Sequence, residues 1–220
     1  MPTAPPVKAR RSQASRSATT RTALVAAARR LFAEQGFAAV GTETIVAAAG
    51  VTRGALYHQF ADKTALFATV LDEVEADIAA RLSAEVASAT ADPIEAVRQS
   101  ARAWLRICVE PDIQRVVLVD GPSVLGWTTW REICRRHVFG LVHAMIEQAV
   151  AVGRIRSSAS LPLAHVLMGA SDEAALYVAQ ASDPEAARAE MIVALEALID
   201  GVAVGSDASG GAVGEDGGRR

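Results

Sequence analysis

The chain has 220 residues, of which 51% are hydrophobic and only 5% aromatic. This length suits one compact body, or a small domain attached to a larger one. Long alternating runs of Val, Ile, Thr and Tyr are absent from the sequence, which argues against a sheet protein and favours an all-α fold. No stretch of about 18 residues is free of charge, and no apolar signal segment opens the chain, so we expect no membrane span and no secretory leader.

Charge is divided unequally along the chain. The formal net charge is −3, yet residues 1–64 contain nine Lys or Arg against three Asp or Glu. The remainder contains 13 basic and 22 acidic residues. A basic opening segment indicates a polyanion-binding region. The only two cysteines, Cys108 and Cys134, lack metal-binding spacing. We therefore expect buried thiols in a reduced, cytoplasmic protein without metal or cofactor.

The opening of the chain is predicted to be an arm followed by a helix. Residues 1–18 are rich in Pro, Ser, Ala and Arg and are expected to form a disordered basic arm. A first helix is predicted from about Thr20 to Gln35, capped by Thr19 or Thr20 and ended by Gly36. Apolar residues recur along it at helical spacing, namely Leu24, Ala28, Leu31 and Phe32.

Two short helices joined by a glycine turn are predicted next. Thr42 would cap the first, which ends near Ala49, and Gly50 would make the turn. Thr52 would cap the second, which runs to about Gln59. Asp62 would then cap a long helix from Lys63 to the late eighties. A short helix pair joined in this way is typical of a helix-turn-helix, residues 19–65 here.

The last helix of this unit has an outer face suited to DNA. The apolar residues of the two short helices and their flanks would face Leu31 and Phe32 of the first helix, and these apolar residues are Ile45, Ala49, Val51, Leu56 and Phe60. The outer face would then carry Thr52, Arg53, Gly54, Tyr57 and His58, small at the start and polar beyond. Each also has an ordinary role open to it: Thr52 as a cap, Arg53 and His58 as solvated side chains, Tyr57 as a half-buried aromatic. Gly54 inside a helix costs about 1 kcal/mol relative to Ala, which suggests close approach to something.

Residues 20–66 resemble the DNA-binding domain of the TetR family of bacterial repressors. The resemblance rests on Ala49-Gly50-Val51-Thr52, on Gly54-Ala55-Leu56-Tyr57-His58-Gln59-Phe60 and on Asp62-Lys63, which match the family's pattern. It implies contacts with a double-stranded DNA operator by Thr42, Thr44, Thr52, Arg53, Gly54, Tyr57, His58 and Lys63. Arg53 is the best candidate for reading a base, while Thr42, Tyr57 and Lys63 suit phosphates.

The rest of the chain is predicted to be helical to about residue 203, with a flexible tail over 204–220. Prolines and glycines divide it into about five helices after the long one, giving about nine in all. Residues 66–203 resemble TetR-type C-terminal domains, and the segments VDGPSVLGW (119–127) and WREI (130–133) resemble one subgroup of them. Such domains bind effectors and dimerise.

Dimerisation is expected through the last two helices, roughly 162–181 and 185–203. Their apolar and small residues form the candidate interface, namely Val166, Gly169, Ala170, Ala174, Val178, Ile192, Leu195 and Ile199. The alternative is that these faces belong to the core of one chain. A two-fold dimer implies a palindromic operator with half-sites about 34 Å apart or more.

An effector pocket is expected among the adaptable and aromatic residues of this larger domain. These are Trp104, Cys108, Val117, Leu118, Leu125, Trp127, Trp130, Cys134, His137, Met145, Met168 and Tyr177. Most must be core, and the chosen candidates are Trp104, Cys108, Trp127, Trp130, His137, Met168 and Tyr177. Their character predicts a hydrophobic or aromatic effector. His137, His143 and His165 are possible polar anchors, but a structural role is open to each.

The sequence therefore predicts a transcriptional repressor released from its operator by a small molecule. A TetR-like activator, or a regulator that needs no ligand, remains an alternative. A non-specific DNA-binding protein is a further alternative, against which the large acidic domain argues. No nucleophile elbow, phosphate loop or zinc motif occurs, so the sequence argues against an enzyme.

Overall fold

Helix α1 (Val7–Gln35) begins well before the predicted start near Thr20. The computed structural model describes residues 7–89, 92–155 and 159–204. The prediction of a disordered arm over 1–18 is therefore wrong from Val7 onward, and residues 1–6 lie outside the described residues. Neither Gly nor Pro interrupts 7–35, and Ser17 is anchored because its Oγ accepts a hydrogen bond from Gln59 Nε2 at 2.7 Å. Thr20 consequently lies inside the helix and caps nothing.

Helices α2 (Thr42–Ala49) and α3 (Arg53–Gln59) form the predicted helix-turn-helix. The cap of α2 is Gly41, not Thr42, and it makes no side-chain capping bond. The prediction for Thr52 is confirmed, because its side chain accepts a hydrogen bond from the Ala55 N–H at 3.2 Å. Gly50 takes the left-handed conformation, with φ of 67°, that this tight turn requires.

Helix α4 (Lys63–Ala89) starts in the core of the N-terminal domain and continues into the rest of the molecule. Asp62 caps it as predicted, accepting from the Ala65 N–H at 2.7 Å. Phe67 of α4 is fully buried and packs edge-on against Phe32 and Phe37, with ring centroids 5.4 and 5.2 Å away. We call residues 7–70, which include the first two turns of α4, the head, and we call the rest of the described chain the body.

The body consists of five further α-helices and one π-helix among the described residues. They are α5 (Pro93–Ile107), the π-helix η1 (Ile113–Asp120), α6 (Gly121–Arg136), α7 (Val138–Ala151), α8 (Ser160–Gln180) and α9 (Pro184–Val202). Most breaks fall at the predicted prolines, and Asp92 and Asp183 cap α5 and α9 by accepting backbone N–H bonds. The prediction of an all-α fold with about nine helices is confirmed for the described residues.

Helix α6 departs from a regular helix at Gly126, which has a φ of 72°. This kink changes which side chains face inward, and it leaves Trp127 64% exposed while Trp130 is buried. Gly121 permits that burial: a Cβ there would lie 2.7 Å from Trp130 Cδ1. The Trp130 indole instead packs against the bare glycine and donates a hydrogen bond to the Val117 carbonyl of η1 at 3.0 Å.

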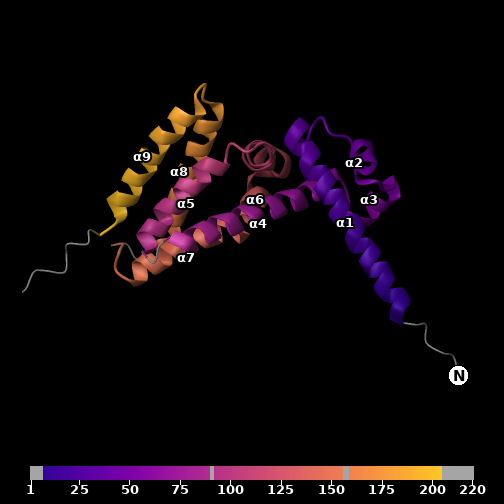
Figure 1. Ribbon diagram of the computed structural model, residues 1–220, viewed down its shortest axis with the longest axis horizontal. Coiled ribbons are helices and arrows are strands. Elements are labelled where there is room, and N and C mark those ends of the chain that lie inside the picture. Colours follow the sequence, from indigo (N-terminus) through magenta and orange to yellow (C-terminus); the bar gives the residue numbers. More distant parts are fainter. Residues whose placement is uncertain (1–6, 90–91, 156–158, 205–220) are drawn as a thin grey trace, which may run out of the picture.

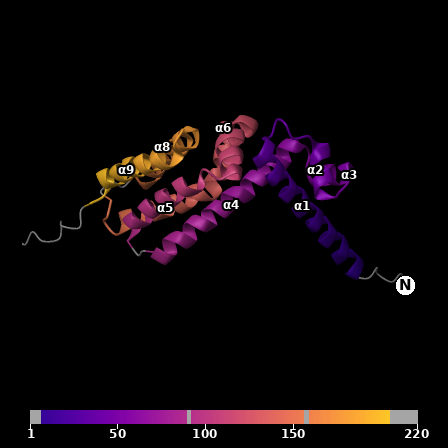
Figure 2. The same cartoon turned by 45° about the horizontal axis from the view of Figure 1, so that its top comes forward.

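The head lies at one end of an elongated molecule, and α4 runs from it along the body (Figures 1 and 2). Helices α8 and α9 lie beside each other at the end far from the head (Figure 1). No helix in the described ranges is both long and apolar enough to cross a membrane. Nor do those ranges contain three or more His, Cys, Asp or Glu side chains grouped to hold a metal ion.

Candidate DNA-binding face and effector cavity

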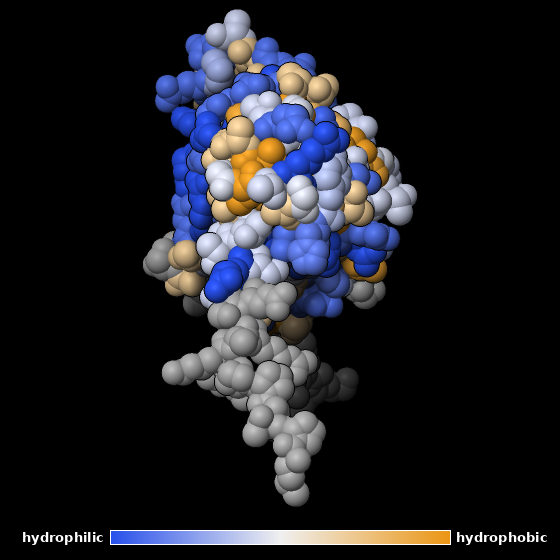
Figure 3. All heavy atoms as spheres, turned by 90° about the vertical axis from the view of Figure 1, so that its right-hand side faces the viewer, coloured by the Kyte–Doolittle hydropathy of each residue, from blue (hydrophilic) through white to orange (hydrophobic). Residues whose placement is uncertain are grey.

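The outer face of the head is formed by the start of α2 and by α3. Thr44, Thr52, Arg53, Gly54, Tyr57 and His58 are all exposed there, and Thr42 is half-buried. The inner faces carry the fully buried Ile45 and Leu56, with Phe60 also buried. Figure 3 views the molecule from the head end, where hydrophilic residues cover much of the surface. The seven predicted contact residues on these two helices are thus brought together on one polar face.

Arg53 is held by an acidic neighbour in this face. Its Nη1 lies 3.0 Å from Glu43 Oε1 of α2, and its guanidinium lies 5.6 Å from the Tyr57 ring centroid. Both charged side chains are well exposed, so water screens the pair and its contribution is small, about 0–1 kcal/mol. Arg53 is therefore free to exchange Glu43 for another acceptor at little cost.

Lys63 occupies a different place from the other predicted contacts. Its half-buried ammonium donates to the carbonyls of Phe37 and Val40, at 2.8 and 2.9 Å, and lies 4.0 Å from the Phe37 ring centroid. These bonds fasten the loop between α1 and α2 to the start of α4. The side chain that sequence reasoning assigned to a phosphate is thus also a structural tie within the head.

The body contains a narrow, mostly apolar cavity enclosed by α4, α5, η1, α6, α7, α8 and α9. Its lining is Glu75, Leu82, Val97, Ser100, Ala101, Trp104, Val117, Trp130, Cys134, Val138, Val142, Met145, Leu167, Met168, Ser171, Asp172, Leu195 and Ile199. The volume open to the centres of water molecules in this cavity is about 40 Å³. That is room for a few waters, so a larger ligand requires the lining side chains to move apart.

Three of the seven predicted effector residues line this cavity, namely Trp104, Trp130 and Met168. The other four do not line this cavity, and their assignment to an effector site stays a prediction. Cys108 is buried away from it, and its thiol bonds to the Leu105 carbonyl. His137 pairs with Asp72, Nε2 to Oδ1 at 3.0 Å, while Trp127 and Tyr177 lie on the surface. Among the broader candidates, Val117, Cys134 and Met145 do line the cavity.

Two carboxyl groups, those of Glu75 and Asp172, belong to the cavity wall. Glu75 is only 3% exposed; its Oε1 accepts from the Cys134 thiol at 3.1 Å, while burial raises its pKa from near 4.5 to about 7. Burial also raises the pKa of Asp172 to about 6, against the opposing effect of Arg131, whose Nη1 lies 3.3 Å from it. The Arg131 guanidinium in turn lies beside both tryptophan rings, 4.7 Å from the Trp127 centroid and 4.5 Å from the Trp130 centroid.

Sequence reasoning missed Glu75, although the sequence holds a signal for it. Along α4, Leu71, Ile78 and Leu82 are fully buried and spaced to share one face of the helix. Glu75 stands four residues after Leu71 and three before Ile78, in the middle of that face. A carboxylate in an apolar helical stripe indicates a buried functional or paired group.

Comparison with known proteins agrees with this two-part architecture. A family model described as bacterial regulatory proteins of the tetR family matches residues 24–70, and one described as a tetracyclin repressor-like C-terminal domain matches residues 94–202. A TetR-family transcriptional regulator from Pectobacterium atrosepticum is 34% identical in a solved structure, with a TM-score of 0.75; the match covers 87% of this chain and 97% of that one. The chain belongs to the TetR family.

Two further proteins illustrate the range of this family resemblance. The HTH-type transcriptional regulator AcrR of Shigella flexneri is 36% identical over 80 residues, which are 36% of this chain and 37% of AcrR. The structure of RolR in complex with resorcinol has a TM-score of 0.66 at 18% identity, covering 84% of this chain and 95% of RolR, and it shares the fold. The TetR family is one of DNA-binding transcriptional regulators, and this chain is such a regulator.

The eight residues of α8 and α9 that were predicted to form a dimer interface fall into two groups. Val166 and Gly169 are exposed, and Ala170 and Ile192 are half-buried. Ala174, Val178, Leu195 and Ile199 are buried within the chain, and the last two line the cavity, so assigning these four to the interface was wrong. The outer apolar face carries Val166, Tyr177, Val193 and Leu198, each more than 45% exposed.

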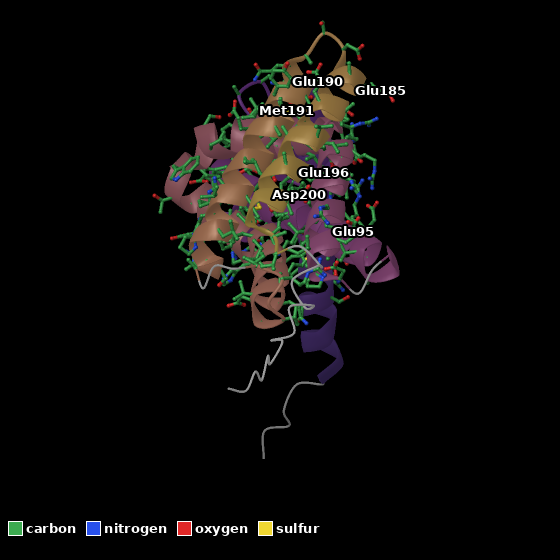
Figure 4. All side chains as sticks on the ribbon, turned by 90° about the vertical axis from the view of Figure 1, so that its left-hand side faces the viewer. Glu95, Glu185, Glu190, Met191, Glu196 and Asp200 are labelled. Atoms are coloured by element: carbon green, nitrogen blue, oxygen red, sulfur yellow. The ribbon has the colours of Figure 1, made fainter. Side chains whose placement is uncertain are left out.

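One edge of this outer face is charged and internally paired. Arg102 of α5 bonds Glu196 of α9 at 2.5 Å and Glu95 at 3.0 Å, and Arg98 bonds Asp200. Figure 4 looks onto this end of the molecule, where Glu95, Glu196 and Asp200 lie between α5 and α9. A polar edge beside an apolar face is the usual arrangement of a protein interface.

The head of this TetR-family regulator is tied to the body by η1 as well as by α4. Asp120, at the end of η1, accepts the Phe37 N–H at 2.7 Å through Oδ2. Asp112, before η1, accepts from Arg29 Nη2 of α1 at 2.7 Å, and Arg29 also pairs with Asp77 of α4. Since Val117 of η1 lines the cavity and holds Trp130, the cavity wall and the head share one short helix.

Proposed function

We propose that this TetR-family regulator is a repressor that binds a palindromic operator and releases it when a small, mostly apolar or aromatic effector enters the body cavity. One observation carries the proposal: helix α1, against which α3 packs, also packs against η1 and α4, and both of these helices line the cavity. An effector that pushes the cavity wall apart then changes the position of the head relative to the body. A TetR-like activator would show the same binding and the opposite effect on transcription.

In this proposal α3 enters the major groove of DNA. Gly54 supports it, because a Cβ there would meet nothing in the protein closer than Thr52 Oγ1 at 3.9 Å. No contact within the protein therefore requires a glycine in the first turn of α3, whereas close approach of DNA would. Arg53 reads a base edge, and Thr42, Thr44, Thr52, Tyr57 and His58 position the phosphates.

Selection from random-sequence DNA followed by footprinting tests the DNA-binding proposal. We expect a palindromic site with half-sites about 34 Å or more apart. Arg53→Ala should cost about 1–3 kcal/mol on that site and relax its sequence preference at one position per half-site. Arg30→Ala is the control, since Arg30 is an exposed residue of α1 paired with Glu34 at 3.6 Å. Failure of any sequence to be enriched would contradict a specific operator.

Lys63 is proposed to contact a phosphate while it holds the α1–α2 loop. An ammonium has three N–H donors, and two of them serve the Phe37 and Val40 carbonyls. Lys63→Met should weaken binding to all sequences and flatten the salt dependence of binding by about one unit. An unchanged slope with weaker binding would assign Lys63 to the loop alone.

We also propose that two copies pair through the outer apolar face of α8 and α9. A free apolar face of this kind is typical of an interaction surface, and TetR regulators dimerise. Analytical ultracentrifugation should show a dimer at micromolar concentration. Val193→Glu should shift it toward monomer, whereas Val152→Glu, at an exposed valine that follows α7, should not. A monomeric parent protein would refute the proposal.

A further inference from the structure

The cavity wall contains one buried acceptor that no described residue satisfies. Glu75 Oε1 receives the Cys134 thiol, but Oε2 is buried and has no hydrogen-bond partner among the described residues. Glu75 belongs to α4 and lines the cavity. Buried polar atoms in folded proteins are nearly always paired, and one that faces a cavity is available to a ligand.

The charges around Glu75 leave its own charge uncompensated. Asp172, the other carboxyl of the cavity wall, is paired with Arg131 at 3.3 Å. His137, the nearest histidine, is engaged with Asp72 at 3.0 Å. Cys134 offers Glu75 only a neutral S–H donor. An ionised Glu75 thus lacks a cationic partner in the site.

The remaining lining sets the shape of a complementary ligand. Aliphatic and sulfur-containing side chains from seven helices surround the space, with the rings of Trp104 and Trp130 on its wall. Both indole N–H groups are already used, by the Ser171 and Val117 carbonyls, each at 3.0 Å. The tryptophans therefore present apolar surface, and Glu75 is left as the unsatisfied acceptor.

We propose that the cavity selects apolar ligands bearing one protonated amine, which donates a hydrogen bond to Glu75 Oε2. The inference rests on the proposed function, because it names the chemical class of effector for the same cavity. A carboxylate ligand would place like charges together. A neutral hydroxyl would satisfy the oxygen but would leave the buried charge without a counter-charge.

The test uses four small probes with one phenyl ring: 2-phenylethylamine, 2-phenylethanol, ethylbenzene and phenylacetate. Isothermal titration calorimetry at pH 8 measures each against the full chain, Glu75→Gln, and the control Glu73→Gln at an exposed carboxylate of the same helix. We expect the amine to bind about tenfold or more tightly than the alcohol, since one charge-assisted hydrogen bond is worth at least that. Glu75→Gln should remove this preference and keep alcohol binding, while Glu73→Gln should change neither.

The outcomes separate the inference from the proposal beneath it. If the alcohol or ethylbenzene binds as tightly as the amine, or Glu75→Gln keeps the amine preference, the inference is overturned and an apolar effector site stands. Ala101→Leu fills the cavity with a larger side chain and should abolish binding of every probe. Binding that survives Ala101→Leu, or no binding of any probe to the parent protein, contradicts the effector site itself, and both proposals fall.

Titration of the same binding gives a second readout. Lowering the pH from 8 to 6 protonates Glu75, whose pKa lies at about 7, and should weaken amine binding while the amine keeps its charge. Asp172 on α8, with Arg131, Cys134 and His137 on or next to α6, also faces or neighbours this carboxyl. Glu75→Gln retains all four groups, so the pH effect should vanish in that variant. A pH effect of equal size in Glu75→Gln would assign it to those neighbours and contradict the inference.

Discussion

The head and the body differ in how completely their interiors are packed and hydrogen-bonded. The head core is closed, with Leu24, Phe32, Ile45 and Leu56 fully buried. Among described residues, the buried side-chain atoms without a hydrogen-bond partner are Glu75 Oε2, Gln99 Oε1 and Arg154 Nε, and all three lie in the body. The body also contains the cavity. The closed core of the head suits a fixed binding surface, whereas the unfilled space and the unpaired carboxyl oxygen of the body suit the ligand response that we propose.

The largest expected effect is on the head core. Phe67→Ala should lower the free energy of unfolding by about 3–5 kcal/mol, because it opens a cavity where three phenyl rings pack. Urea unfolding followed by circular dichroism measures this. Tyr57→Ala, at the exposed aromatic residue of α3, should change stability by less than about 0.5 kcal/mol and instead weaken DNA binding. Equal stability losses would mean that the head is less tightly organised than its geometry indicates.

Glu75 should make the body less stable as the pH rises. Its folded pKa of about 7 lies above the usual value of 4.5, so between these two the folded state holds a proton that the unfolded state has lost. Unfolding free energy should therefore fall across that window, by up to roughly 3 kcal/mol. Urea titrations at pH 4.5 and 8 should show this fall reduced in Glu75→Gln and retained in Glu73→Gln. An identical fall in both variants would place the effect elsewhere.

A smaller effect is expected where the two regions meet. Asp120→Ala removes the acceptor of the Phe37 N–H and should cost about 1–2 kcal/mol of stability. Amide hydrogen exchange should become faster at Phe37 and in the α1–α2 loop. Ser123→Ala is the control, because this exposed hydroxyl of α6 donates to the Val119 and Asp120 carbonyls of η1 and not to the head. Unchanged exchange at Phe37 would show that η1 does not hold the head.

The smallest effect concerns the DNA face. Glu43→Gln removes a carboxylate from that face and frees Arg53, so operator affinity should rise by about 0.5 kcal/mol or less at low salt. The matched control is Glu34→Gln, which releases Arg30 on α1. Fluorescence anisotropy with labelled operator measures both. A loss of affinity in Glu43→Gln would mean that Glu43 positions Arg53 for its contact.

The head could be predicted from sequence because its signals are local. Gly50 and Thr52 each fix the backbone within a few residues, and the spacing of Ile45, Leu56 and Phe60 follows from helix geometry. The two errors are also instructive. Gly41, not Thr42, caps α2, and the start of α1 follows a contact between Ser17 and Gln59 that lies 42 residues away in sequence.

The cavity could be predicted only in part because its wall is assembled from seven helices. Trp104, Trp130 and Met168 were found from their chemistry, yet Trp127 does not line this cavity, because a single positive φ at Gly126 breaks the helical period of α6. Leu195 and Ile199 were assigned to an outer face because apolar periodicity does not say which neighbour covers a helix. Which face of α9 turns inward depends on α5 and α8, to which it packs.

The central claim is that the cavity and the DNA-binding face are coupled. It is tested most directly by measuring the affinity of 2-phenylethylamine for the free protein and for the protein saturated with its selected operator. Linkage requires that an effector that weakens operator binding must itself bind the operator complex more weakly, by the same factor. The account predicts a loss of about fivefold or more in amine affinity on DNA, the usual lower range for such coupling. Equal affinity for the two forms would contradict it.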